Sequence, residues 1–406
     1  MKPPINSKAV PRTVRAEARP QVALLIETSN AYARGLLEGV AAYLREHRPW
    51  SIYLSEHGRG ESIPAWLHRW KGDGIIARVE NASIAKAVMG RALPTVDLSA
   101  GRLLKNAPCV ETDNAAIARL AARHLLDRGF RRLGFCGITD YAWARLRMEH
   151  FQHAAREAGL DCHVHMVGKR ADSAAHWLKD QRDLARWVTA LPKPVGIMAC
   201  FDIRGRQLLD ACRTAGIRVP DDVAVVGVDD DALLCELADP PLSSIAPDTH
   251  RTGYMAAELL DRMLAGHVVL PALHLIAPLH VVARRSSDAL AIDDPDVSVA
   301  LRFIREHACD GVTVQDLLRH VPLSRRVLEA RFIKTLGRSP HQEILRCRIE
   351  HVKKLLSETD LPFKAIAKKS GFAHTEYLSV AFKRLTGTRP SEHRRSARDL
   401  SAPPPR

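Results

Sequence analysis

The sequence contains no long hydrophobic run. Nowhere do about eighteen consecutive apolar residues occur, so it predicts no transmembrane helix and no membrane partner. The N-terminal residues are basic and rich in proline, and no apolar stretch that could form a signal peptide precedes Val22. We therefore expect a cytoplasmic protein. Residues 1–20 show no periodicity and are predicted to form a disordered basic arm, which is either an inert tail or a contact to DNA or an acidic surface.

Metal-binding and redox patterns are also missing. The eight cysteines form no CxxC pair, and the nineteen histidines show no metal-ligand spacing. His163 and His165 alternate along a predicted strand, which is more typical of a protein surface than of a metal site. We expect the cysteines to be small core residues in a reducing compartment, and we expect neither a metal nor a cofactor.

Motifs of the common catalytic folds do not occur. The sequence has no GxSxG, P-loop or GxGxxG pattern, and no nucleophile is paired with a base in the patterns described below. The chain is therefore predicted not to be an enzyme. Its 406 residues, of which 46% are hydrophobic, are typical of a globular protein with two or three domains.

Positive charge is in excess and is unevenly placed. The net charge is +14, and residues 295–400 hold 21 Lys and Arg against 12 Asp and Glu, an excess of +9. About a quarter of the chain therefore carries well over half of the excess. This distribution predicts that the C-terminal segment binds a polyanion.

The segment from Gly311 to Pro390 repeats one helical pattern twice. In the first unit, apolar residues recur at helical spacing from Val314 until a proline stops the helix, and Ser324 can cap the next helix. In the second unit, a short helix ends at Gly371 and a final helix follows. One longer helix joins the units. The residues predicted to face the interior include Leu317, Leu318, Val321, Leu328, Phe332, Leu336, Leu345, Ile349, Val352, Leu356, Ile366, Leu378, Ala381, Phe382 and Leu385.

Fixed spacings within this segment carry a family resemblance. They are Leu328-Glu329-Ala330-Arg331-Phe332, Gly337-Arg338-Ser339-Pro340, Arg348-Ile349, Leu355-Leu356, Ile366-Ala367, Gly371-Phe372, Tyr377-Leu378, Phe382-Lys383 and Gly387-Thr388-Arg389-Pro390. Together they resemble the signature of the AraC-type DNA-binding domain. The resemblance implies an all-helical double helix-turn-helix domain, which we place at residues 298–397, and double-stranded DNA as the partner. Residues 398–406 are predicted to be a disordered tail.

The second helix of each unit is the predicted DNA reader, and the two readers would enter successive major grooves. Arg325 and Arg326 can form bidentate hydrogen bonds with guanine, and Glu329 either accepts from cytosine or orients one of these arginines. Arg348, Lys353, Lys383 and Arg384 are predicted to be phosphate contacts or solvated charges. The predicted DNA-binding set is Ser324, Arg325, Arg326, Glu329, His374, Thr375, Glu376, Ser379 and Lys383.

From Val22 onward, short apolar runs alternate with helical segments. Continuous apolar runs such as Val22–Ile26 are typical of strands buried on both faces. Two rounds of alternation, over residues 22–129 and 132–228, predict two Rossmann-like lobes whose parallel sheets are covered by helices on both faces. A helix over residues 249–264 and two further strands complete the region, and residues 289–297 are predicted to be a polar linker. The predicted fold class is therefore α/β followed by all-α.

A second resemblance covers residues 21–288. It is carried by Ala144-Arg145-Leu146-Arg147, by the run from Gly216 to Asp230, and by Pro241-Leu242-Ser243-Ser244-Ile245. These residues resemble the sugar-binding domain of LacI-type repressors and periplasmic binding proteins. Those repressors carry their DNA-binding unit in front, whereas here an AraC-type unit follows. This order, with the run from Leu24 to Val40 and with Arg284-Arg285-Ser286-Ser287-Asp288, resembles the xylose-operon regulators.

Ligands in parallel sheets bind beyond the carboxyl ends of the strands, so polar residues just after the strands are candidate ligand contacts. Carboxylates and guanidinium groups hold sugar hydroxyls by charge-assisted hydrogen bonds, and an aromatic ring can cover the apolar sugar face. The predicted set is Glu27, Asn30, Asp97, Asp113, Trp143, Arg147, Asp202, Arg204 and Asp229. The resemblance implies that Arg147 and Asp229 hold sugar hydroxyls and that Asp202 and Arg204 lie at another contact. Phe201 departs from the family pattern, because LacI-type proteins usually have asparagine at this position. This departure leaves the identity of the sugar open.

Several of these residues have a purely structural alternative. Asp113 begins a helix and is an N-cap in that interpretation. Trp143 could pack at the interface of the lobes instead of stacking on a ligand. Asp230 and Asp231 are predicted to be solvated turn residues.

Together these features predict a sequence-specific transcription regulator that responds to a sugar, D-xylose or a related pentose, and activates sugar-utilisation genes. We expect a homodimer, with RNA polymerase as a further partner. The alternatives are a sensor of a nucleoside or another small molecule, a repressor, and an enzyme with a DNA-binding appendage.

Overall fold

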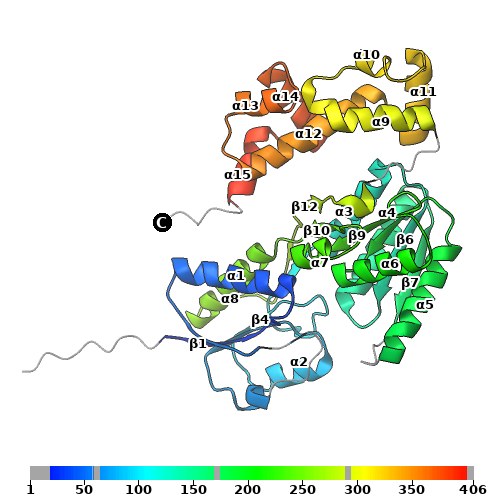
Figure 1. Cartoon of the computed structure of the whole chain (residues 1–406). Helices are drawn as coiled ribbons and strands as arrows, with labels where there is room; N and C mark the ends of the chain where they lie inside the picture. Colours follow the sequence, from blue (N-terminus) through cyan, green and yellow to red (C-terminus); the bar gives the residue numbers. More distant parts are fainter. Residues whose placement is uncertain (1–18, 57, 59–64, 169–173, 289–293, 400–406) are drawn as a thin grey trace, which may run out of the picture.

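The computed structural model describes residues 19–56, 58, 65–168, 174–288 and 294–399. The predicted arm falls mostly on residues 1–18 and most of the predicted tail on residues 400–406, and both segments lie outside the described residues. Two α/β lobes lie below a helical C-terminal domain in Figure 1. This arrangement confirms the predicted fold class.

The first lobe, lobe 1, is built on a six-stranded sheet in the order β11-β5-β4-β3-β1-β2, with every pairing parallel. Helices α1 (Ala31–Glu46) and α8 (Thr249–Leu264) cover one face, and α2 (Ala82–Met89) with the short 3-10 helix η1 (Ala65–Arg69) covers the other. The strands are β1 (Gln21–Leu25), β2 (Ser51–Leu54), β3 (Gly74–Ala77), β4 (Thr95–Asp97), β5 (Cys109–Thr112) and β11 (Leu273–Ile276).

The second lobe, lobe 2, has a six-stranded sheet in the order β12-β10-β9-β8-β6-β7, which is parallel except for β12. Helices α3 (Asn114–Asp127) and α4 (Ala142–Glu157) cover one face, and α5 (Ala174–Ala190) and α6 (Asp202–Thr214) cover the other. The strands are β6 (Leu133–Ile138), β7 (Cys162–Val167), β8 (Val195–Ala199), β9 (Val223–Val228), β10 (Ser243–Ala246) and β12 (His280–Val282).

The chain passes between the lobes three times, from β5 to α3, from β10 to α8 and from β11 to β12. Backbone hydrogen bonds tie these crossings together, from Asp113 N to Ile276 O (2.8 Å) and from Leu279 N to Ala246 O (2.9 Å). The prediction of two consecutive lobes is therefore wrong in one respect. Helix α3 was predicted to close the first round, but its apolar face packs on the sheet of lobe 2.

Lobe 1 depends on an unusually close contact between α1 and α8. A β-carbon added at Gly39 would lie 2.0 Å from the carbonyl oxygen of His250, and one added at Gly253 would lie 1.9 Å from that of Leu36. Only glycine permits such an approach of two helix backbones. The contact brings the returning helix α8 against the N-terminal part of the chain and so closes the lobe.

The C-terminal domain has two hydrophobic cores that share the long helix α12. One core lies under the first helix-turn-helix unit and contains Phe332, and the other lies under the second unit and contains Phe382. The elements are α9 (Pro295–His307), η3 (Ala308–Asp310), α10 (Val314–Leu317), α11 (Arg325–Leu336), α12 (Pro340–Glu358), α13 (Phe363–Lys369), α14 (Thr375–Thr386) and α15 (Pro390–Asp399).

Some predicted boundaries shift. Helix α9 begins at Pro295, inside the predicted linker, because Asp294 caps it through the backbone N–H groups of residues 296 and 297. Leu385, predicted to be buried, is 48% exposed at the end of α14. The predicted turn residue Asp231 caps the unpredicted helix α7 (Ala232–Glu236), and Asp230 is ion-paired with Arg284.

Across the described residues, no helix is both long and apolar enough to cross a membrane. In the same part of the chain, no group of three or more His, Cys, Asp and Glu side chains is arranged to hold a metal ion. The cysteines are all free thiols.

Candidate functional site

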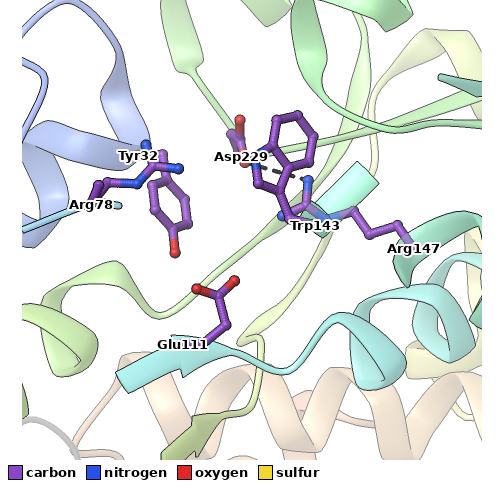
Figure 2. Close-up of a pocket in the computed structure, with 6 residues that line it drawn as sticks. All are labelled: Tyr32, Arg78, Glu111, Trp143, Arg147 and Asp229. Atoms are coloured by element: carbon purple, nitrogen blue, oxygen red, sulfur yellow. Dashed lines mark ion pairs between the residues drawn. The ribbon is translucent and has the colours of Figure 1, made fainter. Parts of the chain in front are cut away.

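A small cavity lies where the lobes meet (Figure 2). The side chains of lobe 1 come from the first turn of α1, from the position after β3 and from β5, and those of lobe 2 come from α4 and from the position after β9. The residues that line it are Tyr32, Arg78, Glu111, Trp143, Arg147 and Asp229. The predicted contacts Trp143, Arg147 and Asp229 are therefore brought together by the fold.

Arg147 is held in place on several sides. Its Nε donates to Asn114 Oδ1 (2.9 Å), its Nη1 donates to the carbonyl oxygen of Cys200 (2.6 Å), and Nη1 lies 3.8 Å from Asp229 Oδ1. The guanidinium also lies over the Trp143 ring, 5.0 Å from its centroid. Only 3% of this arginine is exposed. Its orientation is thus set by the protein before any ligand arrives.

Trp143 packs against aromatic residues of its own lobe and also lines the cavity, and its stacking on a ligand stays a prediction. Its ring stacks on Tyr141 at 5.3 Å with a 17° interplanar angle, and it meets Phe201 edge-on at 5.7 Å and 72°. The ring is 5% exposed, yet it also lines the cavity. Packing against aromatic neighbours therefore fixes the ring at the position where a ligand would meet it.

On the lobe 1 side, Arg78 forms ion pairs with Glu27 (Nη1 to Oε2, 2.9 Å) and with Glu80 (Nη2 to Oε1, 2.6 Å). Its guanidinium lies 5.0 Å from the centre of the Tyr32 ring. Tyr32 in turn shares a 2.9 Å hydrogen bond with the Thr112 hydroxyl. The predicted contact Glu27 does not line the cavity. It positions Arg78 through their ion pair.

Glu111 has an unusual protonation state for a carboxylic acid. Burial raises its pKa to about 8, against the opposing effect of Arg78, so that it is mainly neutral near pH 7. A neutral carboxylic acid can donate as well as accept a hydrogen bond. Its Oε1 already accepts from Asn114 Nδ2 at 3.3 Å, which leaves the rest of the group available to a ligand.

The prediction that Arg204 contacts a ligand is wrong. Its guanidinium is 1% exposed and forms a bidentate ion pair with Asp180 of α5, at 2.5 and 3.1 Å, on the opposite face of the sheet from the cavity. Nη1 donates also to Gln207. The side chain leaves α6 toward α5 rather than toward the strand ends, a direction that sequence spacing alone does not reveal.

Asp202 does not line the cavity either, but it supports a residue that does. Its carboxylate accepts from the Ser244 hydroxyl (2.6 Å) and from the backbone N–H of Asp231 (2.8 Å). Asp229 and Asp230 have positive φ angles of 106° and 46°, which side-chain-bearing residues rarely adopt. Asp202 thus anchors the strained turn that presents Asp229 to the cavity.

The remaining predicted contacts act as helix caps or turn anchors. Asn30 Oδ1 accepts from the Ala33 N–H (2.9 Å), and Asp113 Oδ1 accepts from the Ala116 N–H (2.8 Å), so the N-cap interpretation of Asp113 holds. Asp97 accepts from the hydroxyl and N–H groups of Ser99. None of these three residues lines the cavity.

Three lining residues, Tyr32, Arg78 and Glu111, were absent from the predicted set. Arg78 directly follows the strand β3, so the rule that selected Glu27 also applies to it. Tyr32 lies in a helix and Glu111 lies within a strand, and no local pattern distinguishes them from core positions. Their role follows only from the way in which the lobes meet.

The predicted reader helices present polar side chains to solvent. In α11, Ser324 is the N-cap, and Arg325 Nε is ion-paired with Glu329 Oε1 at 2.9 Å. Glu329 therefore contacts Arg325 in this structure, and both its orienting role and a contact to cytosine stay predictions. Arg326 is exposed on the same turn.

In α14, His374 is the N-cap position but makes no capping bond with its side chain, so the imidazole is left for other contacts. The Ser379 hydroxyl donates to the carbonyl oxygen of Thr375 (2.9 Å), and Glu376 and Lys383 are exposed. Each predicted residue of this reader except the half-buried Thr375 is thus on the outer face.

One predicted phosphate contact must be corrected. The guanidinium of Arg348 donates to the carbonyl oxygens of Ala308 and Val312, each at 2.8 Å, and so ties α12 to the segment before α10. Lys353 is ion-paired with Glu350 at 2.8 Å on the surface of α12. Lys383 and Arg384 are exposed, and whether they are phosphate contacts or solvated charges stays a prediction.

Three family models match the chain. The XylR N-terminal domain matches residues 21–115, a periplasmic binding protein-like domain matches residues 122–287, and a helix-turn-helix domain matches residues 317–396. The first range lies in lobe 1, the second covers lobe 2 and also α8 and β11 of lobe 1, and the third lies in the helical domain.

Comparison with curated proteins and solved structures gives full-length relatives. The chain is 33% identical over 386 residues to the xylose operon regulatory protein of Escherichia coli strain K12, covering 93% of this chain and 97% of that protein. It is 31% identical to the protein of the same name from Haemophilus influenzae, covering 92% and 98%. The structure of the xylose-binding transcription activator XylR covers 94% of this chain and 99% of its own, with a TM-score of 0.60 and 31% identity.

Proposed function

Because the chain belongs to the family of xylose operon regulatory proteins, which are DNA-binding transcription regulators, we propose that it binds D-xylose or a closely related pentose and activates sugar-utilisation genes. The ligand occupies the cavity between the lobes, and the operator is read by α11 and α14. The protein acts as a cytoplasmic homodimer that contacts RNA polymerase, and it catalyses no reaction.

The charge balance of the cavity is the observation that supports a neutral sugar as the ligand. Arg78 is balanced by Glu27 and Glu80, Arg147 lies 3.8 Å from Asp229, and Glu111 is mainly neutral near pH 7. No positive charge is left over to attract a sugar phosphate or a sugar acid. The lining offers both hydrogen-bond donors and hydrogen-bond acceptors, and this combination favours a small neutral molecule with several hydroxyl groups.

The proposed mechanism is a shift between open and closed arrangements of the lobes. The sugar contacts residues from both lobes, so it binds the closed arrangement more tightly than the open one. A ligand can shift such an equilibrium only by this difference in affinity. The closed dimer then holds its reader helices at a spacing that fits two neighbouring major grooves of the operator.

The proposal is tested by titrating D-xylose, L-arabinose and D-ribose against binding of the full-length protein to promoter DNA in a gel-shift assay. We expect D-xylose to tighten DNA binding and the variant Arg147→Ala to lose this response, because its guanidinium would no longer hold sugar hydroxyls. DNA affinity that none of the three pentoses changes would overturn the pentose proposal.

A second candidate function is the sensing of a nucleoside, since Trp143 and Phe201 lie near the cavity. A planar base held between two rings needs them nearly parallel, but these rings are inclined by 72°. The pentose is therefore favoured. Thermal-shift measurements with nucleosides and pentoses side by side separate the two ligand classes, since the true ligand stabilises the folded protein.

A repressor would release promoter DNA when the sugar is added, the opposite direction in the same gel-shift assay. An enzyme with a DNA-binding appendage would convert the sugar, which chromatography of a long incubation would detect.

A further inference from the structure

Helix α3 runs from the cavity to the C-terminal domain. Its 14 residues span about 21 Å at the usual rise of an α-helix. In Figure 1 it lies on the side of lobe 2 that faces α9 and α12. The structure therefore offers a direct connection between the candidate sugar site and the first DNA-reading unit.

The last residue of α3, Asp127, is the centre of the contact with the C-terminal domain. Its carboxylate pairs with Arg346 of α12 (2.9 Å) and with Arg338 (3.4 Å). Its backbone carbonyl oxygen accepts from Arg305 of α9 (3.1 Å) and from Arg338 (3.3 Å). Cationic side chains at the C-terminus of a helix are favourable because the helix dipole is negative there.

Contacts of two further residues, Glu343 and Arg131, support this joint. Glu343 is completely buried and accepts hydrogen bonds from both Arg338 and Arg346. It therefore orients the two guanidinium groups that reach Asp127. Arg131, in the turn after α3, donates to the carbonyl oxygen of Thr335 in α11 (2.8 Å). We call this set of contacts around Asp127 the α3 clamp. It holds α11 of the first helix-turn-helix unit together with α9 and α12, which share the hydrophobic core under that unit.

The other end of α3 is joined to the cavity by Asn114, its first residue. The Asn114 side chain accepts from Arg147 Nε (2.9 Å) and donates to Glu111 (3.3 Å). It is 5% exposed, so these bonds are shielded from water. Arg147 of lobe 2 and Glu111 of lobe 1 therefore share one partner, and that partner belongs to the helix that ends in the clamp.

We propose that Asp127 couples sugar binding to DNA binding by locking the first reader unit to lobe 2 through the α3 clamp. This inference rests on the proposed function of the cavity. Lobe 2 moves relative to lobe 1 when the sugar closes the cleft, and the clamp makes the readers follow lobe 2. Without the clamp, lobe closure no longer changes the placement of the readers.

The experiment measures a coupling factor for the full-length protein. It is the dissociation constant for DNA without D-xylose divided by that with saturating D-xylose. The probe is a duplex that the wild-type protein selects from a randomised pool in the presence of D-xylose. Coupling factors of about 5 to 150 are usual for allosteric proteins, and DNA must strengthen sugar binding by the same factor.

Two substitutions at Asp127 are compared. Asp127→Asn removes the charge and keeps the backbone contacts, so the coupling factor should fall. Asp127→Lys adds repulsion to the clamp arginines, so the factor should approach 1. Sugar affinity in the absence of DNA, measured by calorimetry, should stay within about twofold of wild type because Asp127 lies outside the cavity. Asp161→Lys, an equal charge change on an exposed residue before β7, is the matched control and should keep wild-type coupling.

If either Asp127 variant fails to fold, Arg131→Gln tests the same clamp and should lower the coupling factor less strongly. Wild-type coupling in folded Asp127→Lys, or in Arg131→Gln where the Asp127 variants do not fold, would overturn the role of the clamp while leaving the sugar-responsive function intact. A wild-type protein whose DNA affinity responds to none of the three pentoses would overturn the proposed function and this inference with it.

Discussion

The side chains around the cavity are oriented by protein partners rather than left free for the ligand. Arg78 is held by two glutamates, and Arg147 is held by Asn114 and the Cys200 carbonyl. Preorganised groups of this kind lose little conformational entropy when a sugar binds. Glu111 differs from them, because its pKa lies close to the physiological range and its hydrogen-bonding role can change with pH.

We predict that sugar affinity falls as the pH rises through about 8. Burial raises the pKa of Glu111 above its usual value, and a bound sugar buries the group further, so binding favours the protonated acid. Below that pH the acid is already protonated and affinity should be constant. Calorimetric titration of D-xylose between about pH 6.5 and 9 measures the effect.

Glu111→Gln is the control, because an amide of similar shape does not ionise in this range. The variant should bind with an affinity that is independent of pH. An unchanged pH dependence in this variant would show that another group is responsible.

The helices of the DNA-binding domain divide their residues between an apolar face and a reading face. In α11, Leu328 and Phe332 are buried, while Arg325 and Arg326 face outward. The Arg325–Glu329 ion pair restricts Arg325, whereas Arg326 stands on the exposed surface of the first turn. The first turn of a recognition helix is where side chains reach base edges.

We predict that Arg326→Ala and Lys383→Ala weaken DNA binding in different ways. Loss of a bidentate arginine–guanine contact should cost about 1–3 kcal/mol and relax the preference at one base pair. Loss of a phosphate contact should weaken all sequences alike and reduce the slope of log affinity against log salt by about 1. Binding of the selected duplex and of single-base variants, measured at several salt concentrations, separates the two effects.

If Arg326→Ala lowered the affinity for every duplex equally, Arg326 would be a phosphate contact rather than a base contact. A base-specific loss for Lys383→Ala would likewise contradict its predicted role.

At the scale of the whole molecule, lobe 2 and the DNA-binding domain meet in a joint rich in ion pairs. The buried carboxylate of Glu343 holds Arg338 and Arg346, which both reach Asp127 across the joint. Burial raises the pKa of Glu343, but the hydrogen bonds and charges of these two arginines outweigh burial and lower it to about 2. Its charge therefore stabilises the folded state over the whole neutral range.

We predict an acid-sensitive step in stability that originates from Glu343. Because its pKa in the folded state is depressed, its contribution is fully present above the ordinary value of 4.5 and is lost as the pH falls toward about 2. Urea unfolding of the full chain, followed by circular dichroism at stepped pH, measures this loss.

Glu343→Gln should lower stability at pH 7, since the two arginines lose their buried counterion, and should flatten the acid dependence. Glu350→Gln, which removes an exposed ion pair on the same helix, is the control and should change stability little. A Glu343→Gln protein with the wild-type acid dependence would contradict the prediction.

Local sequence patterns were sufficient for most elements and for the order of the domains. Apolar spacing and turn residues placed the reader helices, the joining helix α12 and the alternating strands, because helices and turns are governed by residues close in sequence. The cap at Ser324 and the end of α13 near Gly371 were predictable for the same reason. So were Arg147 and Asp229, whose flanking residues carry a family resemblance.

The tertiary structure decided which residues line the cavity. Arg78 and Arg204 both follow buried strands, yet the first lines the cavity and the second is bound to Asp180 on the other side of its sheet. Helix α3 follows a strand of lobe 1 but packs on lobe 2, and its last residue meets arginines more than two hundred positions away. The physical reason is that side-chain direction and long-range contact depend on how complete lobes pack, and nothing local in the sequence specifies that packing.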